Sequence, residues 1–194
     1  VTLTLTQGDR ELAREVQTVR MLSYDAWSGT HIFPETTSAF VTPAHPYVAE
    51  IIKNASSVLR HWSRDAAFRG YAAKDPNASR TQMAAIYTAI QCEKIQAVEM
   101  TAPFSEDEHR IRLFERIRSK KEATALELAF LYAACLEAVG LHSILVFFVR
   151  HCVVGTWLID NYFSESIQDD ASQLTKRTAE GIAEICLSDI DGLT

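Results

Sequence analysis

The sequence predicts an α+β domain in which helices pack on an antiparallel sheet. Two observations lead to this class. Hydrophobic residues repeat with the 3.6-residue period of helices through the middle of the chain, between Tyr47 and Glu93. After a further helix, β-branched and aromatic runs that are typical of strands follow one another closely between Ser143 and Ile190. Helices that come first and neighbouring strands that come last favour an α+β layer over alternating βαβ units.

Length and composition are those of one ordinary globular domain. The 194 residues are 47% hydrophobic and 23% charged, and the formal net charge of −6 does not favour binding to nucleic acid. The four cysteines form no C-x-x-C pair, which favours reduced, buried thiols and a cytoplasmic location. The spacing of the histidines predicts no metal site, and nothing in the sequence predicts a cofactor.

The sequence predicts no association with a membrane. The first residues lack the basic region and the apolar core of a signal peptide. The apolar run over residues 126–149 is long enough to span a bilayer, but Glu127, Glu137, Gly140 and His142 interrupt it.

Residues 1–25 are predicted to form an N-terminal strand and linker extension, and residues 26–194 the domain proper. Residues 1–6 alternate between polar and apolar side chains as a strand does. Residues 10–22 fit a helix or a mixed segment. Both ends of the sequence are typical of a domain excised from a longer protein.

Two amphipathic helices are predicted in the middle of the chain. The first spans about residues 47–63 and includes Trp62 on its apolar face. The second covers roughly residues 80–93, with Asn77 or Ser79 as its N-cap.

A third helix is predicted from Thr124, as N-cap, to Gly140, as the residue that ends it. Its many alanines favour close packing on a sheet. Residues 143–149 follow as a strand that we expect to be buried on both faces, because apolar side chains do not alternate there with polar ones.

The rest of the sequence predicts two further strands and a loop. Residues 151–159 form one strand and residues 182–190 the last, and the polar residues 169–181 between them form a loop with a short helix. On the strand that begins at His151, alternation places His151 and Cys152 on opposite faces.

This order of elements is the scaffold that a cysteine hydrolase needs. A thiol at the start of a helix is activated by the helix dipole, a nearby imidazole acts as its base, and a carboxylate orients the imidazole. His151 opens a strand, Asp189 ends the last one, and Ala125 stands where the thiol would be. Thr124, Cys135 and Cys152 are poor substitutes, because of their capping role or their expected burial.

Several motifs resemble those of transglutaminase-like domains, in particular those in the N-terminal part of large bacterial superfamily-one helicases. The segment Ala123-Thr-Ala-Leu-Glu-Leu-Ala-Phe-Leu-Tyr-Ala-Ala-Cys-Leu-Glu-Ala-Val-Gly-Leu141 is similar to the family's G-T-C-L-D-L-A-L-L…L-E-A-x-G-L. Arg150-His-Cys-Val-Val-Gly-Thr-Trp-Leu158 resembles G-H-A-F-x-G-x-W-L, and Glu108-His-Arg-Ile-Arg112 resembles G-Q-R-I-R. Further similarities lie at Trp27-Ser-Gly29, Ala39-Phe-Val41, Gly70-Tyr71 and Leu187–Thr194.

The resemblance implies a papain-like, transglutaminase-type core and maps a Cys-His-acid triad onto Ala125, His151 and Asp189. It also marks Trp27, His109 and Trp157, which lie within the matching motifs, as candidate binding residues. Alanine at position 125 is either an engineered change or a natural loss. Natural loss is favoured, because the family's pattern is also altered nearby, at residues 108, 109, 122, 123 and 150.

Three functions remain open from the sequence. The first is a catalytically inactive transglutaminase-like module that binds a protein or peptide partner, such as the helicase region of its own parent chain. The second is an active peptidase, amidase or transglutaminase whose nucleophile at position 125 was replaced. The third is a nucleic-acid accessory domain that uses the basic residues between Arg110 and Lys121. A solvated helix face is the more ordinary explanation of those residues, because no aromatic platform accompanies them.

Overall fold

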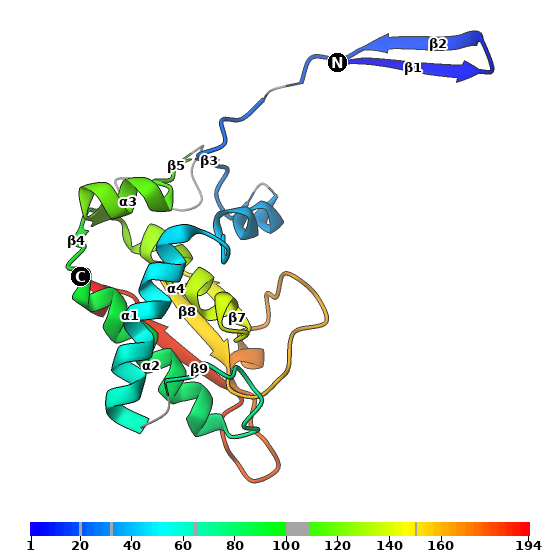
Figure 1. The fold of residues 1–194 in the computed structure, drawn as a ribbon. Coiled ribbons are helices and arrows are strands. Elements are labelled where there is room, and N and C mark those ends of the chain that lie inside the picture. Colours follow the sequence, from blue (N-terminus) through cyan, green and yellow to red (C-terminus); the bar gives the residue numbers. More distant parts are fainter. Residues whose placement is uncertain (20, 32, 64–65, 100–108, 150) are drawn as a thin grey trace.

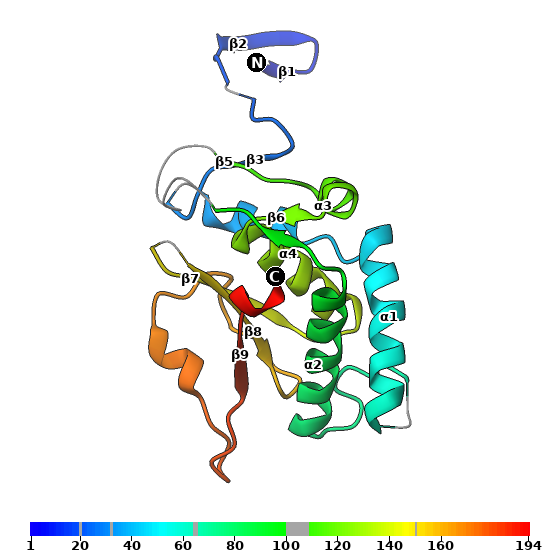
Figure 2. The same cartoon turned by 90° about the vertical axis from the view of Figure 1, so that its left-hand side faces the viewer.

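The helix α4 (Ala125–Ala138) lies at the centre of the fold in the computed structural model, which describes residues 1–194 except 20, 32, 64–65, 100–108 and 150. The helices α1 (Pro46–Ser63) and α2 (Pro76–Cys92) pack against one side of α4. A three-stranded antiparallel sheet packs against another side (Figures 1 and 2). The predicted α+β class is thereby confirmed, with an antiparallel sheet that contacts the helix α4.

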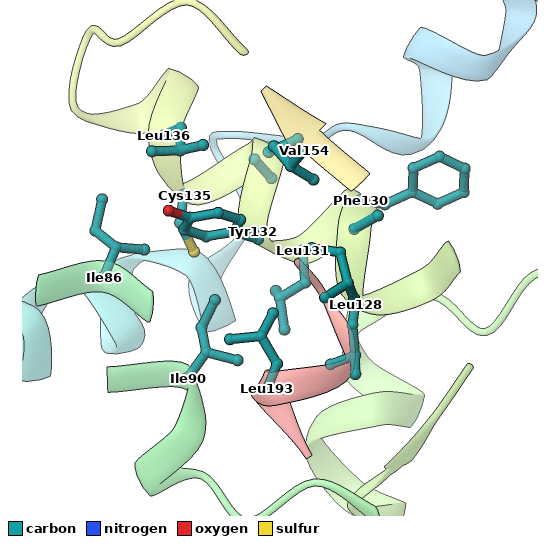
Figure 3. Close-up of a cluster of buried hydrophobic side chains, with 14 of the residues drawn as sticks. Ile86, Ile90, Leu128, Phe130, Leu131, Tyr132, Cys135, Leu136, Val154 and Leu193 are labelled. Carbon is teal, nitrogen blue, oxygen red and sulfur yellow. The ribbon is translucent and has the colours of Figure 1, made fainter. Parts of the chain in front are cut away.

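The helix α4 is a central helix because its sequence is apolar on every side. All residues from Leu126 to Leu136 are buried, including Glu127. Thr124 caps its N-terminus as predicted, and Gly140 follows its last turn with φ +78°. Figure 3 shows the cluster that this burial creates, in which side chains of α4 contact Ile86 and Ile90 of α2, Val154 of the sheet and Leu193 near the C-terminus.

The helices α1 and α2 bury one face each. Their bounds agree with the predicted ones, except that α2 begins earlier, because the Asp75 carboxylate caps it by accepting the N–H of Asn77. The predicted caps, Asn77 and Ser79, are therefore inside the helix. Trp62, which was predicted on the apolar face of α1, is 49% exposed and lies in the last turn of that helix.

The main sheet consists of β7 (Ser143–Phe147), β8 (Cys152–Trp157) and β9 (Ile185–Asp189) in that order. Val153 of β8 lies between Val146 of β7 and Asp189 of β9. The strand β7 is only half buried, in contrast to the prediction of burial on both faces. It is an edge strand of a sheet that α4 covers on one face, so its other face remains partly open to solvent.

Short elements connect these parts. The ribbon β3 (Ala26–Trp27)–β5 (His109–Arg110) is antiparallel, and β4 (Gln96–Ala97) pairs with β6 (Glu122–Ala123) in parallel. The short helix α3 covers Phe114–Lys120, and 3-10 helices cover Pro34–Phe40, Ala171–Thr175 and Asp191–Leu193. The second of these 3-10 helices is the short helix that was predicted in the loop after Asp169.

The N-terminal strands β1 (Thr2–Gln7) and β2 (Arg10–Val16) form a hairpin that stands away from the rest of the chain (Figures 1 and 2). The strand β1 was predicted. Of the two alternatives for residues 10–22, a helix or a mixed segment, the helix was wrong, because residues 10–16 form the strand β2. Pairing with β1 decides this segment, since an isolated charged stretch has no strong preference of its own.

Two of the four cysteines are buried as predicted, Cys135 and Cys152, whereas Cys92 is exposed at the end of α2 and Cys186 is half buried. In the part of the chain that the structure describes, no helix has the length and apolar character needed to cross a membrane.

Candidate functional site

Ala125, the predicted nucleophile position, is the first residue of α4. The preceding residue, Thr124, forms a reciprocal capping box with Glu127: the Glu127 N–H donates to Thr124 Oγ1 over 3.3 Å, and the Thr124 N–H donates to Glu127 Oε2 over 2.8 Å. A helix start is where a thiolate would be stabilised. Here the methyl group of Ala125 offers no group that could react.

The carboxylate of Glu127 already occupies this helix start. Its side chain is 1% exposed and also accepts the backbone N–H of Arg112 over 2.6 Å and the Arg112 guanidinium over 3.1 Å. The buried negative charge is thus neutralised by the helix N-terminus and by Arg112 together. A second anion at position 125 would have to share these donors with Glu127.

His151 and Asp189, the other two predicted triad positions, do come together in the structure. His151 Nε2 lies 3.6 Å from Asp189 Oδ1, and His151 Nδ1 lies 4.0 Å from Asp191 Oδ1. The imidazole also stacks on the ring of Phe148, with 6.2 Å between the centroids. The three polar side chains are 37%, 69% and 70% exposed, so this cluster lies at the surface.

The alternation of the strands places this cluster on the face of the sheet that points away from α4. Ser188 faces α4, because its hydroxyl lies 3.5 Å from the hydroxyl of Tyr132, and Cys152 belongs to the buried core beside α4. Asp189 follows Ser188 on β9 and therefore points to the opposite face. His151 lies on that same outer face, since it contacts Asp189. Ala125 belongs to the helix on the other side.

Two of the thiols near this region are not available as nucleophiles. Cys135 and Cys152 are fully buried in the core. Burial raises the pKa of the Cys135 thiol far above its usual value, and it raises the pKa of the Cys152 thiol to about 12. Both thiols therefore remain protonated and shielded from solvent at neutral pH.

The three predicted binding residues lie in two places. Trp27 and His109 are opposite each other in the β3–β5 ribbon, with ring centroids 5.6 Å apart. Trp27 is fully buried, packs on Phe130 and Phe147, and donates its indole N–H to Thr37 Oγ1 over 2.9 Å. These contacts attach the ribbon to the core.

Trp157 lies elsewhere, on the outer face of the sheet. It is 1% exposed and is covered by the ring of Phe163, at 5.0 Å, and by the ammonium group of Lys176, at 6.0 Å. As the structure stands, a ligand would reach Trp27 or Trp157 only if the covering segments moved. Binding by Trp27, His109 and Trp157 stays a prediction.

Sequence reasoning missed two members of these clusters. Asp191 joins His151 and Asp189, and one ligand atom from each of the three lies within 4.8 Å of the other two. An imidazole nitrogen and two carboxylate oxygens are ligand types that divalent cations bind. The spacing of the histidines in the sequence did not indicate this group. The signal that could have revealed Asp191 is its position only two residues after Asp189, at the start of the last 3-10 helix.

Glu127 is the second residue that the sequence analysis did not place in a site. The pattern Thr124-Ala-Leu-Glu127 is the capping-box signature, and it could have predicted the Glu127 carboxylate at the helix start in addition to the Thr124 cap.

The basic stretch between Arg110 and Lys121 is largely neutralised by acidic side chains. Arg110 pairs with Asp25, Arg112 with Glu127, Arg118 with Glu50 and Lys121 with Glu93. These pairs tie α3 and its flanks to α1, to α4, to the end of α2 and to the residue before β3. They leave little uncompensated positive charge for a phosphate backbone.

The comparisons with known proteins come to the same negative result in each case. The chain matches no protein-family model, no curated protein and no solved structure.

Proposed function

We propose that this chain is a catalytically inactive, transglutaminase-like module that binds a protein or peptide partner within a larger protein. The observation that carries the proposal is the separation of the parts that catalysis would need to combine. Position 125 has a methyl group and lies at the start of α4, whereas His151 and Asp189 lie on the face of the sheet that points away from α4. A base can activate a nucleophile only within hydrogen-bond reach.

The environment of position 125 supports the same proposal. The donors at the start of α4 are committed to Glu127 and Thr124, and this carboxylate would repel a thiolate beside it. Cys135 and Cys152, two other thiols close to the sheet, are buried and protonated. No alternative nucleophile therefore replaces the missing one among these groups.

The surface around His151 supports a binding role. Exposed apolar side chains lie beside the polar cluster on the outer face, namely Phe148, which is 54% exposed, and Leu187, which is 47% exposed. Apolar groups next to Asp189 and Asp191 form a surface that suits a peptide with both apolar and basic side chains. Attachment to a helicase region, as in the transglutaminase-like domains that the motifs resemble, is the setting we propose for such a partner.

Restoring a thiol tests the proposal directly. In Ala125→Cys we expect the new thiol to react with iodoacetamide no faster than an ordinary thiol, with its rate rising at or above about pH 8.5, and we expect no change when His151 is also replaced by alanine. The rates are measured by mass spectrometry of the alkylated peptides. The exposed Cys92 in the same molecule serves as the internal reference.

The opposite outcome would show a working catalytic pair. Rapid alkylation of position 125 near pH 6, lost in the His151→Ala background while Cys92 still reacts as before, would mean that His151 activates the thiol. The chain would then be an enzyme whose nucleophile had been replaced, and the pseudoenzyme proposal would fail.

A further inference from the structure

The second strand of the hairpin, β2, carries four charged residues that the first strand, β1, does not compensate. The residues Arg10, Glu11, Arg14 and Glu15 all lie on β2 and are exposed. The residues opposite them on β1 are Gln7, Thr6, Thr4 and Leu3 in that order, and β1 contains no charged residue. The hairpin therefore offers these charges no opposite charge across its own ladder.

The order of these charges is self-complementary. When the sequence Arg10-Glu-Leu-Ala-Arg-Glu15 is aligned antiparallel to a copy of itself, each charged residue faces a residue of opposite charge. With the centre between Leu12 and Ala13, Arg10 meets Glu15 of the copy and Glu11 meets Arg14. Opposite charges that lie directly across a ladder stabilise the pairing of the two strands.

The backbone of β2 supports the same register. Val1 and Gln17 exchange two hydrogen bonds, of 2.9 and 2.8 Å, so alternation turns the backbone groups of Arg14 away from β1. The register shift between Leu5 and Thr6 leaves Leu12 without an opposite residue on β1. In a regular strand, residues three positions apart direct their backbone groups to opposite sides. The extra residue Leu12 shifts this alternation, so the backbone groups of Glu11 also point away from β1, as those of Arg14 do.

The hairpin also needs further contacts for its stability. It stands away from the body of the protein, and an isolated two-stranded hairpin is at best marginally stable in water. Its apolar residues are exposed, with Leu3 at 52% and Leu5 at 62%. These two side chains lie on one face, together with Ala13, which is opposite Leu5.

We propose that β2 pairs with β2 of a second copy of this chain. The pairing is antiparallel, with the two-fold axis between Leu12 and Ala13, and it yields a four-stranded sheet in the order β1-β2-β2-β1. The same patch meets itself, so the assembly closes as a dimer. The pairing places the leucines of both copies on one continuous face and gives each outward backbone group of Glu11 and Arg14 a partner.

Charge reversal and its compensation test this dimer. Sedimentation equilibrium of the chain is expected to show a dimer, whose dissociation constant rises at least about tenfold in Arg14→Glu and in Glu11→Arg, because each places like charges across the ladder twice. An equimolar mixture of these two variants is expected to dimerise again, since the two glutamates of one variant would then face the two arginines of the other. The double variant Glu11→Arg/Arg14→Glu is expected to dimerise by itself.

Two controls make the result decisive. Arg80→Glu, an equivalent reversal at an exposed position of α2, is expected to leave the dimer unchanged. The melting temperature of the body is expected to be the same in every hairpin variant, which excludes misfolding as the cause. The proposal would be overturned by a chain that stays monomeric at all concentrations, or by a dimer that Arg14→Glu does not weaken. In either case β2 does not pair with β2 of a second copy. The thiol test at position 125 is independent of this result.

Discussion

Replacing Gly70 with alanine is expected to lower the free energy of unfolding by about 2–5 kcal/mol. Gly70 has φ +52°, a left-handed conformation that alanine adopts only with strain. A Cβ atom there would lie 2.9 Å from the carbonyl oxygen of Gly140 and 3.2 Å from that of Val139. These are backbone atoms at the end of the central helix, so they move only if that helix moves.

The position of Gly70 is fixed from the other side as well. Gln82, a buried residue of α2, accepts the Gly70 N–H over 3.0 Å and donates to its carbonyl oxygen over 2.9 Å. The loop cannot retreat from the end of α4 without breaking both hydrogen bonds. The clash therefore has to be relieved by repacking between α2 and α4.

Gly140→Ala is the matched control. Gly140 has a similar left-handed conformation, with φ +78°, but an added Cβ there meets nothing within 4 Å. We expect this variant to lose only the conformational part, about 1–2 kcal/mol. Urea denaturation of both variants measures the difference. Equal losses in the two variants would show that the close approach of Gly70 to the end of α4 does not add to the destabilisation.

Removing the carboxylate of Glu127 is the second change with a large expected effect. Glu127→Ala is expected to lower the free energy of unfolding by about 2–4 kcal/mol, because it leaves the Arg112 guanidinium and two backbone N–H groups without their buried acceptor. The figure is below that of a fully buried ion pair, since the Arg112 side chain is 27% exposed and regains some hydration.

Two variants separate the parts of this effect. Thr124→Ala removes the hydroxyl of the cap but keeps the carboxylate, and we expect a loss of about 1 kcal/mol. Glu127→Gln keeps an acceptor for the N–H groups and removes the charge, so its loss should fall between the other two. Guanidinium denaturation gives all three values. If Glu127→Ala cost no more than Thr124→Ala, the pairing with Arg112 would contribute nothing to stability.

Local patterns in the sequence were sufficient for most helices. The bounds of α1 and the cap and end of α4 agree with the prediction. They depend on the spacing of apolar residues, on the N-cap Thr124 and on the terminating Gly140, which are signals that act within a few residues. The prediction failed where segments distant in the sequence determine the secondary structure or the burial of a residue. Residues 10–16 are a strand only because β1 pairs with them, and β7 is half buried because it forms the edge of its sheet.

The candidate site shows the same division. His151 and Asp189 were predicted from the order of the elements and from a resemblance of motifs, and the structure places their side chains 3.6 Å apart. Trp27 and Trp157 were predicted from the resemblance of motifs alone, and the structure buries both. Exposure depends on what covers a side chain, and those covering residues, such as Phe163 above Trp157, lie in other segments of the chain.

The sequence by itself determined the α+β class, the central helix with its cap, and the absence of a thiol at position 125, because each of these depends on residue type and short-range order. Only the tertiary structure decided which face of the sheet carries His151. The strand period separates neighbouring residues into two faces but does not say which face a helix covers. Packing of α4 against Cys152 and Ser188 settles this and places His151, Asp189 and Asp191 together on the outer side.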